Sequence, residues 1–225
     1  MSKNENCCAY SNNLSSWLRL SWCNLLERTS ADLEIGNKIF RVLIDSYSST
    51  ARKYHNLQHV YDILDLIERA TDRSNNINIL QFAAWFHDYI YHPQASDNES
   101  RSAIAARNFL QQLSLNIETI EAVEKIILST QKHQPLIQDI DNLIFLDLDL
   151  AILGTRSSQY KIYSRKIRQE YSHLSDRDYQ IGRKKVLTQF LARTRIYYTD
   201  YFYRKLELKA RKNIQTEIKS NCFIS

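Results

Sequence analysis

Several histidine and aspartate side chains stand at positions where a polar group is costly. His87 and Asp88 are adjacent inside an apolar run over residues 79–91, and Asp149 interrupts a second apolar run over residues 143–153. A carboxylate in a hydrophobic core is unfavourable unless a counter-charge neutralises it. A divalent cation shared by several of these residues would supply that charge. The pattern therefore predicts a buried metal site.

The candidate ligands come from segments that are far apart in the sequence. His55 and His59 stand one helical turn apart, upstream of the buried pair. Neighbours on a helix point roughly 100° apart, so His87 and Asp88 would converge only on an ion in the groove between their two directions, with further ligands from other helices. The expected ligand set is His59, His87, Asp88 and Asp149.

Two imidazoles and two carboxylates indicate a divalent cation as the cofactor. The set suits Mn, Ni, Co, Fe, Zn or Mg, and it leaves coordination positions for water. Such an ion lowers the pKa of its bound water and so generates hydroxide near neutral pH. This chemistry favours the hydrolysis of a phosphoester.

The composition predicts an all-α fold that positions these residues from separate helices. Three glycines and two prolines are few for 225 residues, whereas β folds use both types heavily at turns. Apolar residues recur at three-to-four spacing, which is typical of helices. No linker is visible, so we expect an N-terminal tail over residues 1–13 and a single-domain helical bundle over residues 14–219.

Ten helices are expected, over about residues 14–27, 31–47, 56–67, 79–91, 96–113, 116–133, 141–153 and 157–172, then one after Ser175 and one over 199–219. Their predicted N-terminal caps are Ser30, Asn116 and Ser175. Ser96 and Glu99 form a predicted capping box, and Gly154 a predicted left-handed C-terminal cap.

Charge, apolar segments and cysteine content indicate which partners and which compartment to expect. The net charge is +5, with the excess in the C-terminal part. This excess is either the solvated faces of helices, the simpler interpretation, or a field that draws in phosphate-bearing substrates. No nucleic-acid-reading motif is present, and no apolar segment reaches the ~18 residues that span a membrane. The four cysteines lack metal or disulfide spacing. We expect a cytoplasmic protein with a small phosphorylated substrate and no membrane partner; self-association into a homo-oligomer is left open.

The order His59, His87-Asp88, Asp149 resembles the H…HD…D signature of the HD superfamily of metal-dependent phosphohydrolases. Over residues 14–215 the chain is similar to a small stand-alone bacterial group of predicted metal-dependent HD phosphohydrolases. The motifs that carry this likeness are Tyr54-His-Asn-Leu-Gln-His59, Trp85-Phe-His-Asp88, Asp97-Asn-Glu99-x-x-Ser-Ala103, Phe145-Leu-Asp-Leu-Asp-Leu-Ala-Ile-Leu-Gly154, Ile167-Arg-x-Glu-Tyr171 and Arg193-x-x-Ile-Tyr197. The resemblance implies an HD-type helical bundle and metal-dependent phosphoester hydrolysis.

The first of these motifs also resembles cyclic-nucleotide phosphodiesterases, a distant branch of the superfamily. That likeness implies that His55 protonates the leaving oxygen while His59 holds the ion. Asp149, followed by Leu-Ala, resembles that branch's metal-binding D-L-S, which favours it over Asp147. Asp147 is left as a competing ligand or as an acceptor that orients an imidazole. The branch's purine-clamping glutamine is not recognisable, and His92 has no counterpart, so a cyclic-nucleotide substrate is not implied.

Several other residues are candidates for the site, and some of them have more than one interpretation. His55 is otherwise a hydrogen-bonding group at a helix start. Glu99 either completes the capping box or activates the attacking water. His133, near a helix end, is either a structural partner of the helix dipole, or a phosphate contact or second-metal ligand. Lys132 and Arg168 are candidates for holding substrate phosphate.

The sequence therefore predicts a metal-dependent phosphohydrolase, a phosphomonoesterase or phosphodiesterase. Its water would be activated by the metal, and its substrates would be small phosphorylated metabolites, nucleotides above all. The alternative is a non-catalytic regulatory protein of the same fold whose pocket senses a nucleotide or a metal.

Overall fold

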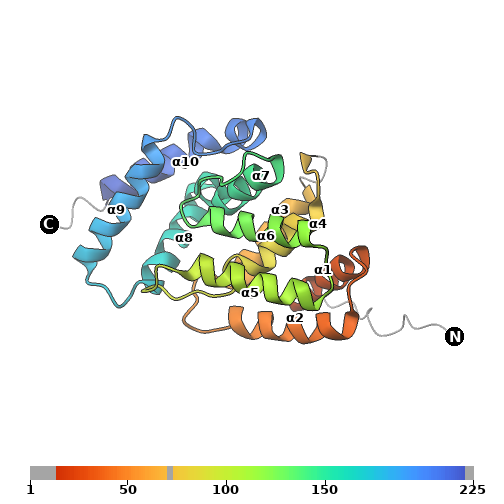
Figure 1. Ribbon diagram of the computed structural model, residues 1–225. Helices are drawn as coiled ribbons and strands as arrows, with labels where there is room; N and C mark the ends of the chain where they lie inside the picture. The colour runs from red at the N-terminus through yellow and green to blue at the C-terminus, as the bar shows by residue number, and fades with distance from the viewer. Residues whose placement is uncertain (1–13, 70–72, 221–225) are drawn as a thin grey trace.

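Helices make up the fold of this computed structural model, which describes residues 14–69 and 73–220; none of these residues lies in a β-strand (Figure 1). The elements are α1 (Leu14–Arg28), α2 (Leu33–Tyr47), α3 (Leu57–Arg69), α4 (Ile77–Phe86), α5 (Asn98–Gln112), α6 (Ile117–Thr130), α7 (Ile140–Asp149), the 3-10 helix η2 (Leu150–Gly154), α8 (Ser157–Glu170), α9 (Asp176–Ala192) and α10 (Asp200–Ser220). The predicted all-α class is confirmed. The tail expected over residues 1–13 lies outside the described residues.

Helix α4 lies at the centre of the core. Its residues from Leu80 to Phe86 are all at most 3% exposed. A helix that is apolar on every side is stable only in the interior, which explains its position. Trp85 packs edge-to-face on Trp22 of α1, with ring centroids 5.4 Å apart. This packing fixes the helix whose end carries the His-Asp pair.

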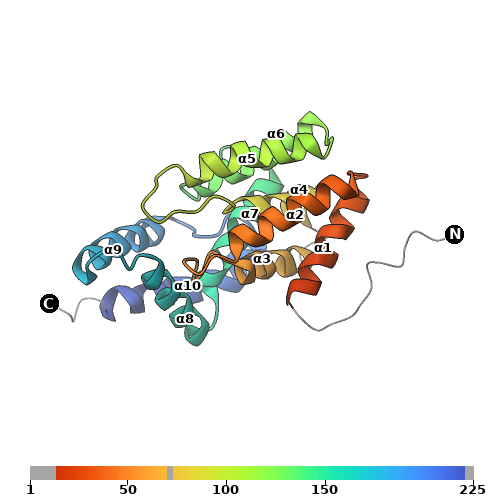
Figure 2. The same ribbon diagram turned by 90° about the horizontal axis from the view of Figure 1, so that it is seen from below.

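The other helices surround α4 and bring the candidate ligands together. Helix α4 contacts α1, α3, α5, α6 and α7, and α3 also contacts α7. Helices α5 and α6 lie side by side, while α8, α9 and α10 gather at the end of the molecule away from α1 (Figures 1 and 2). The start of α3 and the ends of α4 and α7 therefore meet in the interior.

Two of the predicted N-terminal caps are confirmed and one is wrong. The side chains of Asn116 and Ser175 accept from the backbone N–H three residues on, at 2.8 and 3.1 Å. Helix α2 is capped instead by Asp32, which accepts from the N–H of Ile35 at 2.8 Å. Ser30 lies in the preceding turn, in the left-handed region at φ 54°.

The predicted capping box and the predicted left-handed glycine are also wrong. Helix α5 has Asp97 as its N-cap, so Ser96 lies one residue too early to reach the first turn. Gly154 belongs to η2 and has no positive φ. It is required because α10 crosses η2 there: a Cβ on Gly154 would lie 2.5 Å from the Cβ of Leu206.

Candidate metal centre

His87 lies directly after the last residue of α4, which ends earlier than the predicted helix over 79–91. Its backbone is still helical, at φ −59° and ψ −38°. The ring Nδ1 lies 3.1 Å from the carbonyl oxygen of Ala84, so Nδ1–H donates to that oxygen. The lone pair is thereby left on Nε2, which faces the interior. This is the tautomer that a metal ligand needs.

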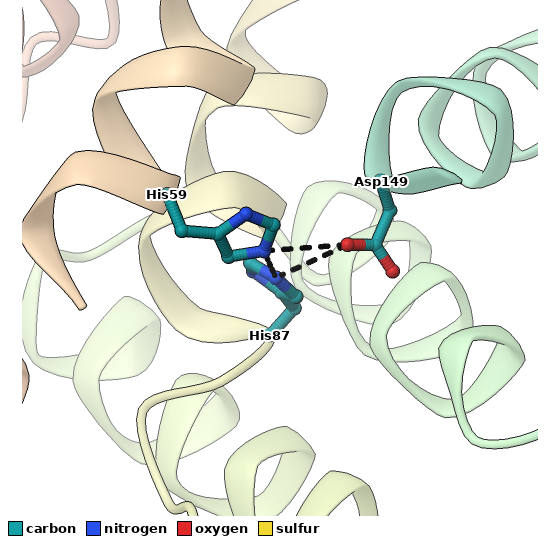
Figure 3. A group of neighbouring side chains, drawn as sticks. All are labelled: His59, His87 and Asp149. Carbon is teal, nitrogen blue, oxygen red and sulfur yellow. Dashed lines mark hydrogen bonds and ion pairs between the residues drawn. The ribbon is translucent and has the colours of Figure 1, made fainter. Parts of the chain in front are cut away.

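His59 and Asp149 point toward the same position as His87 (Figure 3). The Nε2 atoms of the two imidazoles lie 3.1 Å apart, and Oδ1 of Asp149 lies 3.3 Å from His59 Nε2 and 3.8 Å from His87 Nε2. Two nitrogens bound to one ion at ~2.1 Å, with an angle of ~90–110° between them, would lie roughly 3.0–3.4 Å apart. The spacing of these donor atoms therefore fits a shared cation.

Asp88 turns its carboxylate to the same place from the residue after His87. Its Oδ2 lies 3.0 Å from His87 Nε2 and 3.5 Å from His59 Nε2. The backbone at this turn is held by Arg52, which donates to the carbonyl oxygens of Asp88 at 2.6 Å and Tyr89 at 2.7 Å. The structure thus brings His59, His87 and Asp149 together as a group that could hold a metal ion, and it places the fourth expected ligand, Asp88, beside the two imidazoles.

The charged groups of the site are buried, and they shift one another's pKa values. Burial alone would raise the pKa of Asp149, but hydrogen bonds from His133 and His59 and the charge of His87 hold it well below its usual range. Burial would lower the pKa of His87, but the charge and hydrogen bond of Asp88 raise it to about 9. These shifts express the same demand for positive charge between the carboxylates that a divalent cation would meet.

His133 holds the second oxygen of the Asp149 carboxylate. Its Nε2 donates to Oδ2 of Asp149 at 3.0 Å, which leaves Oδ1 free to face the two imidazoles. His133 adopts a left-handed backbone at φ 45°, which is rare outside glycine. Its carbonyl oxygen accepts from Arg193 at 2.8 Å and from the hydroxyl of Tyr198 at 2.9 Å, and these bonds keep it there.

Asp147, the competing ligand, has a different role. It is fully buried and accepts from the backbone N–H groups of Tyr198 at 2.6 Å and Thr199 at 2.8 Å, and from the Thr199 hydroxyl at 2.7 Å. Burial raises its pKa to about 6 although these bonds oppose the rise. Its oxygens are therefore engaged by the chain before α10, whose Tyr198 in turn holds His133.

His55 lies before α3, not within it, and is paired with a buried glutamate. Its Nδ1 lies 2.7 Å from Oε2 of Glu170 and must be the donor, because an ionised carboxylate only accepts. Glu170 also accepts from the N–H groups of Tyr54 and His55, and from the Tyr91 hydroxyl at 3.0 Å. Burial lowers the pKa of His55, but the charge of Asp88 and the Glu170 hydrogen bond outweigh this and raise it.

A cavity of about 420 Å³ opens onto these groups. Of the residues predicted from the sequence, it is lined by His55, Asp88, Glu99, His133 and Asp149. Burial, and then the negative charge of Asp88, raises the pKa of Glu99. The cavity therefore presents one imidazole with a raised pKa and one carboxyl with a raised pKa beside the candidate ligands.

The two predicted phosphate-binding cations are absent from the described lining of this cavity. Arg168 instead closes the α8–α9 turn, where it donates to the carbonyl oxygen of Tyr171 at 2.8 Å and pairs with Asp176 at 2.7 Å. Lys132 is exposed, and its carbonyl oxygen accepts from Arg193 at 2.8 Å. His92 is held by its backbone, which exchanges hydrogen bonds with the Asn98 side chain.

Two residues at the site were missed by reasoning from the sequence. Glu170 was part of a quoted motif but received no role, since a lone glutamate at a helix end gives no signal of its partner. Arg52 was not singled out at all. It is only 8% exposed and joins the chain before α3 to the turn after α4. A buried arginine in a polar loop is recognisable only once the fold is known.

Comparison with known proteins adds no family assignment. No protein-family model matches the chain, and no curated protein matches it significantly. The resemblance to the HD superfamily thus rests on the quoted motifs alone.

Proposed function

We propose that this chain is a metal-dependent phosphohydrolase of the HD superfamily, acting on phosphate esters of small metabolites in the cytoplasm. The observation that carries the proposal is the convergence of His59, His87, Asp88 and Asp149 beside a cavity that is lined by the two carboxylates and by the glutamate-paired imidazole of His55. None of the helices described is long and apolar enough to cross a membrane.

Each side chain has a separate role in the proposed hydrolysis. A divalent cation held by the four ligands would stabilise charge on the phosphoryl oxygens and lower the pKa of a coordinated water. Glu99 faces the same cavity and accepts a proton from the attacking water. The water oxygen bonds to phosphorus while the ester P–O bond breaks. His55 gives its proton to the departing oxygen, so that the products are an alcohol and phosphate, or a monoester where the substrate is a diester.

Glu170 makes His55 suitable as the acid. It fixes the ring by accepting from Nδ1, which directs Nε2 away from Glu170 and leaves that nitrogen for the leaving oxygen. Its negative charge favours the protonated imidazole. Glu170 touches His55 and not the reacting atoms, so it is a positioning residue.

The test combines metal content with turnover. The pure protein is analysed for metals, then assayed on phosphomonoesters and phosphodiesters with Mn, Ni, Mg and Zn. We expect about one ion per chain and turnover that is lost in the double variant His87→Ala, Asp88→Ala. His173→Ala, at an exposed histidine, is the matched control and is expected to retain both.

The alternative is a regulatory protein that senses a nucleotide or a metal without turnover. Stoichiometric metal with no hydrolysis of any phosphoester would favour it over the proposed enzyme. Activity that persists in the double variant would come from another source and would contradict the proposed site.

A further inference from the structure

The cavity extends beyond the candidate ligands into a chamber between α8 and α9. On one side Tyr54, whose ring lies 4.8 Å from that of His59, packs on Tyr163 of α8 at 4.7 Å between centroids. On the other side the ring of His133 packs edge-to-face on Phe190 of α9 at 5.7 Å. Aromatic side chains therefore lead from beside the candidate ligands into the chamber on both sides.

One face of α9 forms the far wall. The lining residues on this helix are Tyr179, Gly182, Arg183, Val186, Leu187 and Phe190. Their spacing of three and four places them along a single face. Gly182 leaves open space at that wall, because a Cβ built there meets nothing within 4 Å. The chamber thus has apolar and aromatic sides and room next to Gly182.

The chamber offers little to bind additional negative charge. Apart from the two histidines, Arg183 is the one cationic residue in its described lining. That guanidinium is already neutralised by Glu217, with Nε 2.9 Å from Oε1, and it lies on the ring of Tyr163. Asp88, Glu99 and Asp149 line the same cavity with negative charge. Apart from the ion and the two histidines, a polyphosphate chain would find no unpaired cation in the described lining.

We infer that the chamber binds the non-phosphate part of the substrate and that this part carries a neutral aromatic or apolar ring. The substrate class is then a phosphate ester with a single phosphate group and a ring-bearing alcohol, and excludes polyphosphates. This inference rests on the proposed function. A volume of about 420 Å³ lies at the small end of the roughly 300–1,000 Å³ of small-molecule pockets, and so fits one such ester.

The test compares esters that differ only in the ring. Ethyl phosphate and 2-phenylethyl phosphate release primary alcohols of similar basicity, so their intrinsic reactivity is matched. We expect kcat/KM at least ~10-fold higher for the phenylethyl ester, as for an apolar group seated in a pocket. Adenosine 5′-monophosphate and adenosine 5′-triphosphate are compared in the same way, and the monophosphate is expected to be preferred at least ~10-fold.

A variant that fills the chamber distinguishes binding of the ring in the chamber from a general preference for more reactive esters. Gly182→Leu places a side chain in the open space, on a helix that leucine favours more than glycine does. The preference for the phenylethyl ester over the ethyl ester is expected to fall at least ~10-fold. Lys185→Leu adds the same side chain at an exposed position outside the described lining and is expected to keep that preference.

The outcomes distinguish the two proposals. Turnover of ethyl and 2-phenylethyl phosphate at equal rates, or a preference unchanged by Gly182→Leu, overturns the chamber while leaving the hydrolase intact. Efficient turnover of adenosine 5′-triphosphate at the β,γ bond overturns the exclusion of polyphosphates. Binding of 2-phenylethyl phosphate to the metal-loaded protein, weakened by Gly182→Leu but without hydrolysis, supports the chamber and refutes the enzyme.

Discussion

At the scale of single residues, the site depends on how the two oxygens of Asp149 are divided. One faces the imidazoles and the other accepts from His133 at 3.0 Å. His133→Ala is expected to weaken divalent-metal binding by about 10–100-fold, because the carboxylate loses the partner that orients it. Competition with a chromophoric chelator measures the affinity. Unchanged affinity would mean that His133 does not position the ligand.

Glu170 gives a residue-scale prediction about pH. Burial would raise its pKa, but the hydrogen bond and charge of His55 and the backbone N–H groups lower it from about 4.5 to about 2. A carboxyl with a depressed folded-state pKa stabilises the fold above its unfolded pKa, and this contribution is lost as pH falls through the folded value. The contribution is about 3 kcal/mol at most.

The measurement is urea unfolding of the wild type and of Glu170→Gln at a series of pH values. We expect the wild type to be more stable near pH 6, and the difference to shrink as pH falls from about 5 to about 2. A difference that stays constant over this range would show that the ionised form of Glu170 is not what matters.

At the scale of elements, two glycines predict opposite effects of the same substitution. Gly154 is overlain by α10, so Gly154→Ala is expected to destabilise the fold by about 1–3 kcal/mol through overpacking. Gly182 lies within α9 with open space around its Cα, so Gly182→Ala is expected to stabilise by about 0.5–1 kcal/mol. Urea unfolding of both variants checks the two signs, and equal effects would contradict the close crossing of α10 and η2.

Most of the helices could be predicted because their signals are local. Apolar spacing and the caps Asn116 and Ser175 lie within a few residues of the helices that they specify. The errors at Ser30 and Ser96 displace a cap by one or two residues, whereas the error at Gly154 falls where a tertiary contact decides. Gly154 reads as a left-handed cap in the sequence, and only the crossing of α10 explains it otherwise.

The candidate ligands could be predicted from the sequence, but the residues that hold them in place could not. Charged residues inside apolar runs are visible in the sequence, which singled out Asp88 and Asp149. What holds them comes from remote segments: Arg52 is 36 residues from Asp88, and Glu170 is 115 from His55. No spacing rule links such partners, so Arg52 was missed and the pairing of Arg168 with Asp176 was not predicted.

At the scale of the whole molecule, the candidate site joins segments that lie far apart in the sequence. Its ligands come from the start of α3, the turn after α4 and the end of α7. An ion bound only by the folded chain stabilises it by RT ln(1 + [M]/Kd), about 2.7 kcal/mol at a concentration 100 times Kd. For a chain of 225 residues this corresponds to a rise in Tm of roughly 5–10 °C.

Thermal melts with saturating Mn or Zn and with a chelator measure this rise. His59→Ala is expected to remove the metal-dependent part, because two carboxylates and one imidazole bind far more weakly than the full set. His173→Ala, at an exposed position, is expected to keep it. A shift of equal size in His59→Ala would place the stabilising ion elsewhere, and the four converging side chains would then be a charge network without a cation at its centre.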